Sequence, residues 1–332
     1  MKKLFAKIVF AVAGFTGVAV AQQDPQFTQF MFNKLIYNPG YAGTSGGICG
    51  VAQYRKQWMG FEGAPTSMAI AGDMRLTNLP LGVGMNIITD KIGPMTTNIV
   101  RFAGSFNKKI GQGTFGLGLD LGILQKKITS VWVVPEPLLT DIRIPGSGGS
   151  VPGPNGTVLS AFTNPDLNKT TIDVGFGAFY QIPGKFYVGI SSTHLPAQQI
   201  KAGALGFQVS RHYYLMTGYT MQLNKWSKLT PNVLYKTDGK ANSLDANLTF
   251  LWSDLIWIGG TYRLDDATAI LAGIQGKAGV GHSISWKAGF SYDLTTPKLK
   301  TYSKGSGEFI MGVCFTPKVS KPTTYRSDRF LD

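Results

Sequence analysis

The sequence predicts an all-β fold: a transmembrane antiparallel β-barrel of about fourteen strands. Two observations lead to this expectation. Beyond residue 46, apolar residues alternate with small or polar ones along most of the chain, and a period of two is typical of a strand with one greasy face. The connections between the alternating segments are in turn short and long, which is the known asymmetry of outer-membrane barrels.

The alternation is clearest at residues 115–123, 243–252 and 283–293. Gly, Ser and Asp occupy the less apolar face, which favours a watery lumen. The outer face of a soluble sandwich would more often carry Lys and Glu. Strands are expected near 46–57, 66–77, 80–90, 97–107, 113–126, 172–181, 185–193, 211–222, 228–236, 243–252, 255–263, 267–276, 282–292 and 305–315.

The connections separate into two classes. Tight turns follow every second strand, and the other connections are longer, at 58–65, 127–171, 194–210 and 293–304. The longest is rich in Pro and Gly, so we expect one long external loop over the barrel mouth. An even strand number places both termini in the periplasm.

The chain divides into four parts. Residues 1–21 combine three lysines, an apolar run and small residues at Ala19 and Ala21, and they predict a cleaved signal peptide. An N-terminal motif segment follows at 22–45, then the outer-membrane barrel at 46–315 and a periplasmic tail at 316–332.

Composition narrows the class of protein. A formal charge of +14 is strongly basic, but an exported chain is not expected to bind nucleic acid. Attraction to outer-membrane lipid and lipopolysaccharide or to an acidic partner explains the charge, and solvated turns explain it equally well. Two cysteines are too few for a small disulfide scaffold.

The segment at 22–43 interleaves aromatic and polar residues before an Asn-Pro-Gly turn. A flexible linker would not carry so many aromatic side chains. We expect it to be ordered and to pack at the periplasmic mouth or inside the lumen. Its anchors, which are also candidates for contact with a partner, are Phe27, Phe30, Tyr37 and Tyr41.

A second aromatic group lies in the first external connection and comprises Trp58, Met59 and Phe61. Contact with a partner protein is one interpretation. An interfacial belt is the other, because Trp and Tyr favour the depth of lipid headgroups.

The phase of the alternation predicts which charged residues face the lumen. A Lys or Arg that faces lipid at mid-membrane costs about 2–4 kcal/mol. The residues expected to face inward are Asp73, Arg75, Arg101, Asp120, Asp173, Asp245, Asn247 and Lys287.

Closure of the barrel makes its first and last strands neighbours. Cys49 lies near the start of the first and Cys314 near the end of the last. If they are opposed, the antiparallel register also places Arg55 opposite Glu308, which gives two sensible cross-strand pairs. Such a cysteine pair is close to disulfide reach. Two unrelated small residues are the alternative.

The sequence gives little sign of catalysis. Residues 111–116 spell GxGxxG, but a strand follows where a dinucleotide site needs a helix. His194, His212 and His282 do not have metal-ligand spacing. We therefore expect no enzyme, no cofactor and no metal site.

Several motifs resemble the PorP/SprF family of type IX secretion outer-membrane proteins. They are QDPxFTQFMFN…NPGYAG from residue 23, YRKQWMGFEGAPTS at 54–67, TDKIGP at 89–94, GLGLDLGILQKKI at 116–128, SYDLT at 291–295 and EFIMGVCF at 308–315.

The resemblance implies a non-catalytic barrel in the outer membrane. The resemblance further implies that this barrel supports export or surface retention of a secreted protein, such as an adhesin, through that protein's C-terminal signal domain. Other type IX secretion components are then expected as partners. A pore for small solutes is the alternative. A soluble secreted β-protein is a third interpretation.

Overall fold

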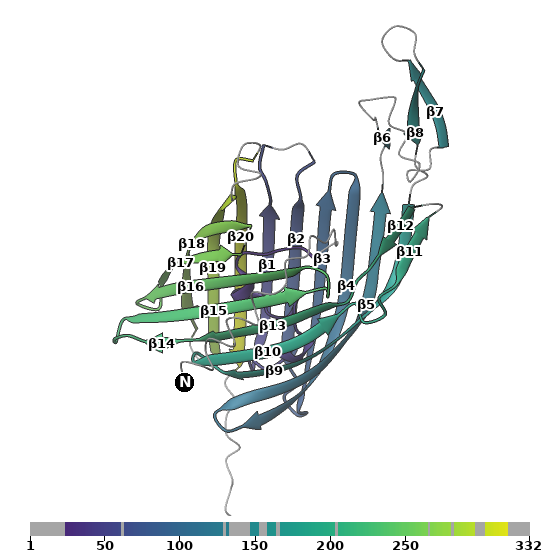
Figure 1. Ribbon diagram of the computed structural model, residues 1–332. Coiled ribbons are helices and arrows are strands. Elements are labelled where there is room, and N and C mark those ends of the chain that lie inside the picture. The colour runs from purple at the N-terminus through teal and green to yellow at the C-terminus, as the bar shows by residue number, and fades with distance from the viewer. Residues whose placement is uncertain are drawn as a thin grey trace, which may run out of the picture.

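The computed structural model describes residues 24–60, 63–128, 131–132, 147–152, 158–163, 167–202, 205–264, 266–279, 282–295 and 303–317. Fourteen antiparallel strands close into a ring, and neighbours in the ring are neighbours in the chain (Figure 1). The ring is completed between the first and last of these strands.

The strands of the ring are β1 (Ile48–Lys56), β2 (Thr66–Arg75), β3 (Leu81–Ile92), β4 (Met95–Ile110), β5 (Gly113–Ile128), β9 (Leu167–Ile182), β10 (Phe186–Thr193), β13 (His212–Tyr219), β15 (Ser227–Thr237), β16 (Asn242–Trp252), β17 (Ile256–Arg263), β18 (Ala267–Ala278), β19 (His282–Thr295) and β20 (Ser306–Pro317). The two-residue strand β14 (Met221–Gln222) pairs with β15 outside the ring. The fold class and the strand number expected from the sequence are confirmed.

The long connections contain more structure than the sequence indicated. β5 and β9 stay paired as far as Ile128 and Leu167, so the loop expected at 127–171 begins later and ends earlier. Within it, β6 (Val131–Trp132), β8 (Val158–Thr163) and β7 (Ser147–Pro152) form a separate sheet beyond the barrel rim (Figure 1). The connection after β10 holds a hairpin of β11 (Gln199–Ala202) and β12 (Leu205–Gln208).

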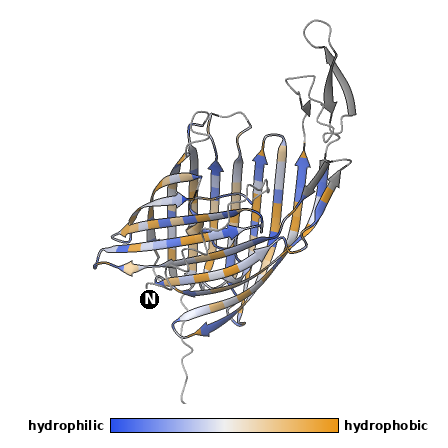
Figure 2. Ribbon diagram, in the orientation of Figure 1, coloured by the Kyte–Doolittle hydropathy of each residue, from blue (hydrophilic) through white to orange (hydrophobic). Residues whose placement is uncertain are grey.

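The barrel has an apolar outer face and a more polar inner one. Figure 2 shows the underlying alternation of hydrophobic and hydrophilic residues along the strands. On β5, Leu117, Leu119, Leu121 and Ile123 are 42–53% exposed, whereas Asp120 is buried. This alternation puts the greasy side chains where lipid surrounds a membrane barrel.

Among the described residues, no helix is long and apolar enough to cross a membrane.

β1 and β20 form the seam that closes the barrel. Cys49 lies opposite Cys314 and Arg55 opposite Glu308, the register expected from the sequence. The cysteines form a disulfide with their Cα atoms 4.0 Å apart. The seam is therefore crossed covalently near the end at which β1 begins.

Candidate functional site: an N-terminal segment inside the lumen

Residues 24–47, here called the plug, run through the lumen before β1 begins. Asp24 lies beside His194 and His212, at the end of the barrel that carries the long connections. Gly43 and Thr44 lie beside Asp73 and Gln181, near the short turns. The plug thus extends from the long-connection end to the short-turn end, where the chain reverses into β1.

Two 3-10 turns shape the plug: η1 (Phe30–Phe32) and η2 (Pro39–Tyr41). Asn38 caps the second, because its side-chain oxygen accepts a hydrogen bond from the Gly40 amide at 2.9 Å. Proline at the first position of η2 supplies a fixed φ and needs no hydrogen-bond acceptor.

Aromatic side chains of the plug are buried against the barrel wall. Phe27, Phe30 and Tyr37 are 1%, 0% and 4% exposed. Tyr41 is half-buried and meets Phe179 edge-on, with ring centroids 5.2 Å apart. Burying one such ring is worth about 1.5–3 kcal/mol. These four residues thus anchor the plug inside the barrel. The three fully buried rings offer no surface to another protein.

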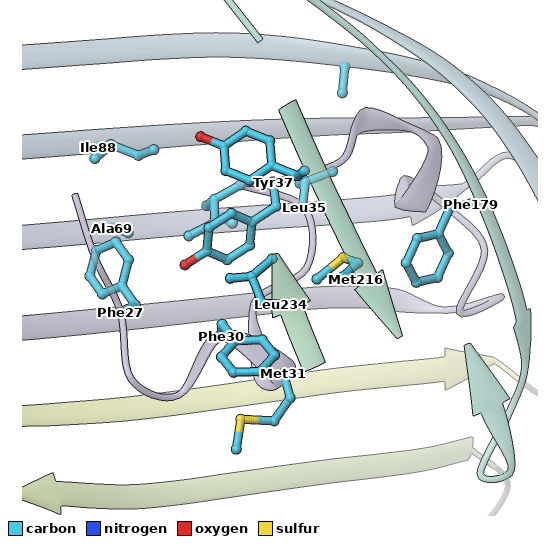
Figure 3. Packing of buried hydrophobic residues seen from close by; sticks show 14 of the residues in the cluster. Phe27, Phe30, Met31, Leu35, Tyr37, Ala69, Ile88, Phe179, Met216 and Leu234 are labelled. Carbon is cyan, nitrogen blue, oxygen red and sulfur yellow. The ribbon is translucent and has the colours of Figure 1, made fainter. Parts of the chain in front are cut away.

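Figure 3 shows this cluster from close by. Phe27, Phe30, Met31, Leu35 and Tyr37 extend from the plug among side chains of the wall. The wall residues labelled there are Ala69, Ile88, Phe179, Met216 and Leu234, all of them buried.

Glycines on the inner face of β5 let the plug backbone approach the wall. A Cβ built on Gly116 would collide with the carbonyl oxygen of Gly40, and one on Gly118 would collide with Pro39. In the other direction, a Cβ on Gly40 would lie 2.7 Å from the Gly177 oxygen. The alternating glycines that marked β5 in the sequence therefore form a seat for η2.

Polar side chains of the wall satisfy the plug backbone. Asn107 donates to the Ala42 oxygen at 3.0 Å, and Ser191 donates to the Tyr37 oxygen at 2.6 Å. The amide of Asn38 in turn donates to two wall carbonyls, at 3.0 and 3.1 Å. A buried backbone carbonyl without a donor would cost about 1–3 kcal/mol, so these contacts fix the position of the plug.

A buried ionic cluster at the seam holds the other end of the plug. Arg55 lies 2.7 Å from Asp293 and 3.2 Å from Glu308, and it donates to the Thr28 hydroxyl at 2.8 Å. The two oxygens of Glu308 accept the backbone amides of Thr28 and Gln29 at 2.7 and 2.9 Å. The expected Arg55–Glu308 pair thus also binds the plug.

Asp24 begins the described part of the plug and forms hydrogen bonds with His194, His212 and Tyr214. Its carboxylate lies 2.9 Å from His194 Nε2 and accepts the Tyr214 hydroxyl at 2.6 Å. His194 Nδ1 lies 3.0 Å from Asp173, which also pairs with Arg101 at 2.7 Å.

Burial alone would lower the pKa of His194, which lies in the connection after β10. The carboxylates of Asp24 and Asp173 outweigh that effect and raise its pKa to about 9. At neutral pH the imidazolium therefore bridges the two carboxylates.

One group of side chains comes close enough to hold a cation. Ligand atoms of Asp24, His194 and His212 all lie within 4.8 Å of one another, although their spacing in the sequence gave no sign of it. The guanidinium of Arg101 lies 3.2 Å from His194 Nε2, where its charge would repel a metal ion. We interpret the group as an ionic anchor of the plug.

The residues predicted to face the lumen lie on the inner face of the barrel in the structure. The side chains of Asp73, Arg101, Asp120, Asp173, Asp245 and Asn247 are buried, and those of Arg75 and Lys287 are half-buried.

The first long connection is ordered where it is described. Trp58 and Met59 are half-buried, and Met59 exchanges backbone hydrogen bonds of 2.8 Å with Lys304 and Gly305 in the connection before β20. Phe61 lies outside the described residues. Contact of this group with a partner stays a prediction.

Sequence reasoning missed the polar residues that hold the plug, namely Asp24, Thr28, Gln29, His194 and Asp293. Their signal was present only in the unusual mixing of polar with aromatic residues at 22–43. Their partners are far apart in the chain and meet only once the barrel closes.

Three comparisons relate the chain to known proteins. The model of the family "Type IX secretion system membrane protein PorP/SprF" matches residues 19–313. A search of curated proteins finds no match.

Among solved structures, the chain is similar to the toluene transporter TbuX of Ralstonia pickettii, with 12% identity, a TM-score of 0.44 and coverage of 92% of this chain and 98% of that one. A FadL homologue of Pseudomonas aeruginosa gives 10% identity, a TM-score of 0.48 and coverage of 88% and 94%. Omp33 of Acinetobacter baumannii gives 7% identity, a TM-score of 0.40 and coverage of 81% and 97%.

The family match spans nearly the whole barrel, and it includes the plug, β1 and most of β20. This chain belongs to the PorP/SprF family of type IX secretion system membrane proteins, and it is an outer-membrane β-barrel.

Proposed function

We propose that this barrel supports export or surface retention of a secreted protein, such as an adhesin, by binding its C-terminal signal domain at the long-connection end. In this proposal the long connections lie outside the cell, the short turns face the periplasm, and the barrel has no catalytic role. Other type IX secretion components are partners on the periplasmic side.

The observation that carries the proposal is the plug. Its aromatic rings are buried in the wall, and its backbone is bound at both ends of the lumen. A barrel filled in this way acts through its rim and not through a channel. Trp58 and Met59, fixed against the neighbouring connection, are the first candidates for the rim contact.

The proposal is tested in cells that secrete a protein with a type IX C-terminal signal domain. We expect deletion of the barrel gene to remove that protein from the cell surface, and the wild-type gene to restore it. Trp58→Ala with Met59→Ala should restore it poorly while keeping normal amounts of folded barrel. Unchanged surface display in the deletion strain would refute the proposal.

Planar-bilayer conductance separates this function from a solute pore. The full barrel should not conduct, whereas a barrel without residues 22–45 should open. Steady conductance by the full barrel would favour the pore.

A further inference from the structure

A second feature of the lumen is a cavity of about 410 Å³ between the plug and the wall. Phe32 and Lys34 of the plug line one side, and Trp257 and Lys287 line the other. The cavity also reaches Lys185, in the short turn after β9, so it opens at the short-turn end.

The two inner lysines are held without an acidic partner. The Lys34 ammonium lies 4.1 Å from the centroid of the Tyr187 ring, and the Lys287 ammonium lies 4.5 Å from that of Phe32. In the described part of the chain, neither forms an ion pair with a carboxylate, whereas Lys228 at the same cavity pairs with Asp254. An aromatic face stabilises an ammonium group only partly, so both charges remain uncompensated.

The lining of the whole cavity carries an excess of positive charge. Its lining includes five lysines, and Asp254 is the acidic residue among the lining side chains. Asp254 is engaged by Lys228. Lys185 and Lys277 stand at the mouth, and Lys34 and Lys287 stand further in.

Trp257 lines the same cavity as the inner lysines. It is 1% exposed, and its ring centroid lies 4.9 Å from that of Phe32. Its indole therefore supplies apolar wall, while the ammonium groups are suited to a ligand that brings negative charge and acceptor oxygens.

We propose that this cavity binds acidic side chains of a protein segment that docks at the short-turn end. Its volume falls in the range of about 300–1,000 Å³ that organic ligands occupy, which is far more than a single small anion needs. Phe32 and Trp257 supply apolar wall between the lysines, so a peptide finds both kinds of contact. Lipid headgroups do not fit, because the cavity lies inside the barrel.

This inference deepens the proposed function, on which it rests only for the statement that the short-turn end faces the periplasm. The docking segment would then belong to a periplasmic component. Charge at the mouth steers such a segment inward, and the attraction weakens with salt.

Binding is measured on the purified full barrel in a neutral detergent. The probes are a hexapeptide of alternating Glu and Gly, the same peptide with Gln in place of Glu, and inorganic phosphate. Calorimetry gives the affinity, and tryptophan fluorescence reports contact with the wall. We expect the Glu peptide to bind and the Gln peptide to bind at least tenfold more weakly. Raising the salt concentration should lower the affinity of the barrel for the Glu peptide.

Lys34→Met and Lys287→Met remove one charge each and keep most of the apolar stem. Each substitution should lower the affinity for the Glu peptide at least tenfold. Lys109→Met is the matched control, because Lys109 is exposed near the end of β4 at the same end of the barrel and does not line the cavity. It should change the affinity less than twofold. Heat-dependent gel mobility verifies that each variant is folded.

Equal binding by the inner-lysine variants and the wild type would overturn the proposal, as would equal binding of the Glu and Gln peptides. Binding of phosphate without binding of the Glu peptide would show a small-anion site and would also overturn it. A barrel that displays its secreted protein in cells but never binds the Glu peptide refutes this inference and leaves the proposed function standing.

Discussion

Glu308→Gln should loosen the plug without opening the barrel wall. The carboxylate of Glu308 is fully buried and accepts the backbone amides of Thr28 and Gln29, one on each oxygen, and it also pairs with Arg55. An amide has almost the same shape, but only its oxygen accepts. Its NH₂ group would face one of the two backbone N–H donors.

The size of the effect follows from these contacts. A hydrogen bond to a charged group contributes about 1.5–3 kcal/mol, and a buried donor left unpaired costs about 1–3 kcal/mol. Loss of one such bond, with weaker pairing to Arg55, should reduce the free energy of seating the plug by about 2–4 kcal/mol. Since 1.4 kcal/mol corresponds to a factor of ten in an equilibrium constant, the unseated fraction should rise roughly 30- to 700-fold.

Hydrogen exchange followed by mass spectrometry measures this change, because local opening controls exchange of protected amides. A peptide that covers residues 24–35 should exchange faster in Glu308→Gln by that factor, while peptides from β4 and β5 keep wild-type rates. Asp254→Asn is the control, since Asp254 pairs with Lys228 on an exposed turn. Wild-type exchange of the plug in a folded Glu308→Gln barrel would refute the assigned role of the carboxylate.

Three further predictions concern the seam, the seat and pH. Replacing both Cys49 and Cys314 by Ser should lower the free energy of unfolding by about 2–5 kcal/mol. Reductant should lower the heat-modification temperature of the wild type but not that of the variant. An equal effect of reductant on the variant would contradict a stabilising disulfide. Gly116→Ala should speed exchange of the plug, whereas Gly104→Ala, which has nothing within 4 Å of the added Cβ, should not; identical rates would exclude a steric seat. The pKa of His194 is raised from 6.5 to about 9, so its stabilisation of the plug is complete below about pH 6.5 and is lost as pH rises through 9. Exchange of the plug should therefore accelerate above pH 9 beyond the intrinsic rate, a step that His194→Gln should abolish.

The barrel could be predicted because its signal is local. Alternation along a strand such as 115–123 reports the face of each residue, and a barrel requires only that the faces agree. The register of the seam was also accessible, since Cys49, Arg55, Glu308 and Cys314 lie on two identifiable strands and a single alignment satisfies both pairs.

The contacts of the plug could be predicted only in part. Aromatic density at 22–43 indicated an ordered segment, but nothing in the sequence indicated that Thr28 meets Glu308 or that Asp24 meets His194. Those residues are separated by 280 and 170 positions. Their distances depend on barrel diameter and strand tilt, which alternation does not report.

The seam has a mechanical consequence. β1 and β20 are joined by a disulfide near the short-turn end. Farther up, Arg55 and Glu308 face each other across the same two strands and both bind Thr28. A sideways exit for a polypeptide into the membrane would have to part these strands. Thr28 therefore ties β1 to β20 at the opposite end of the seam from the disulfide. Parting the two strands there would break both hydrogen bonds of Thr28 as well as the Arg55–Glu308 pair.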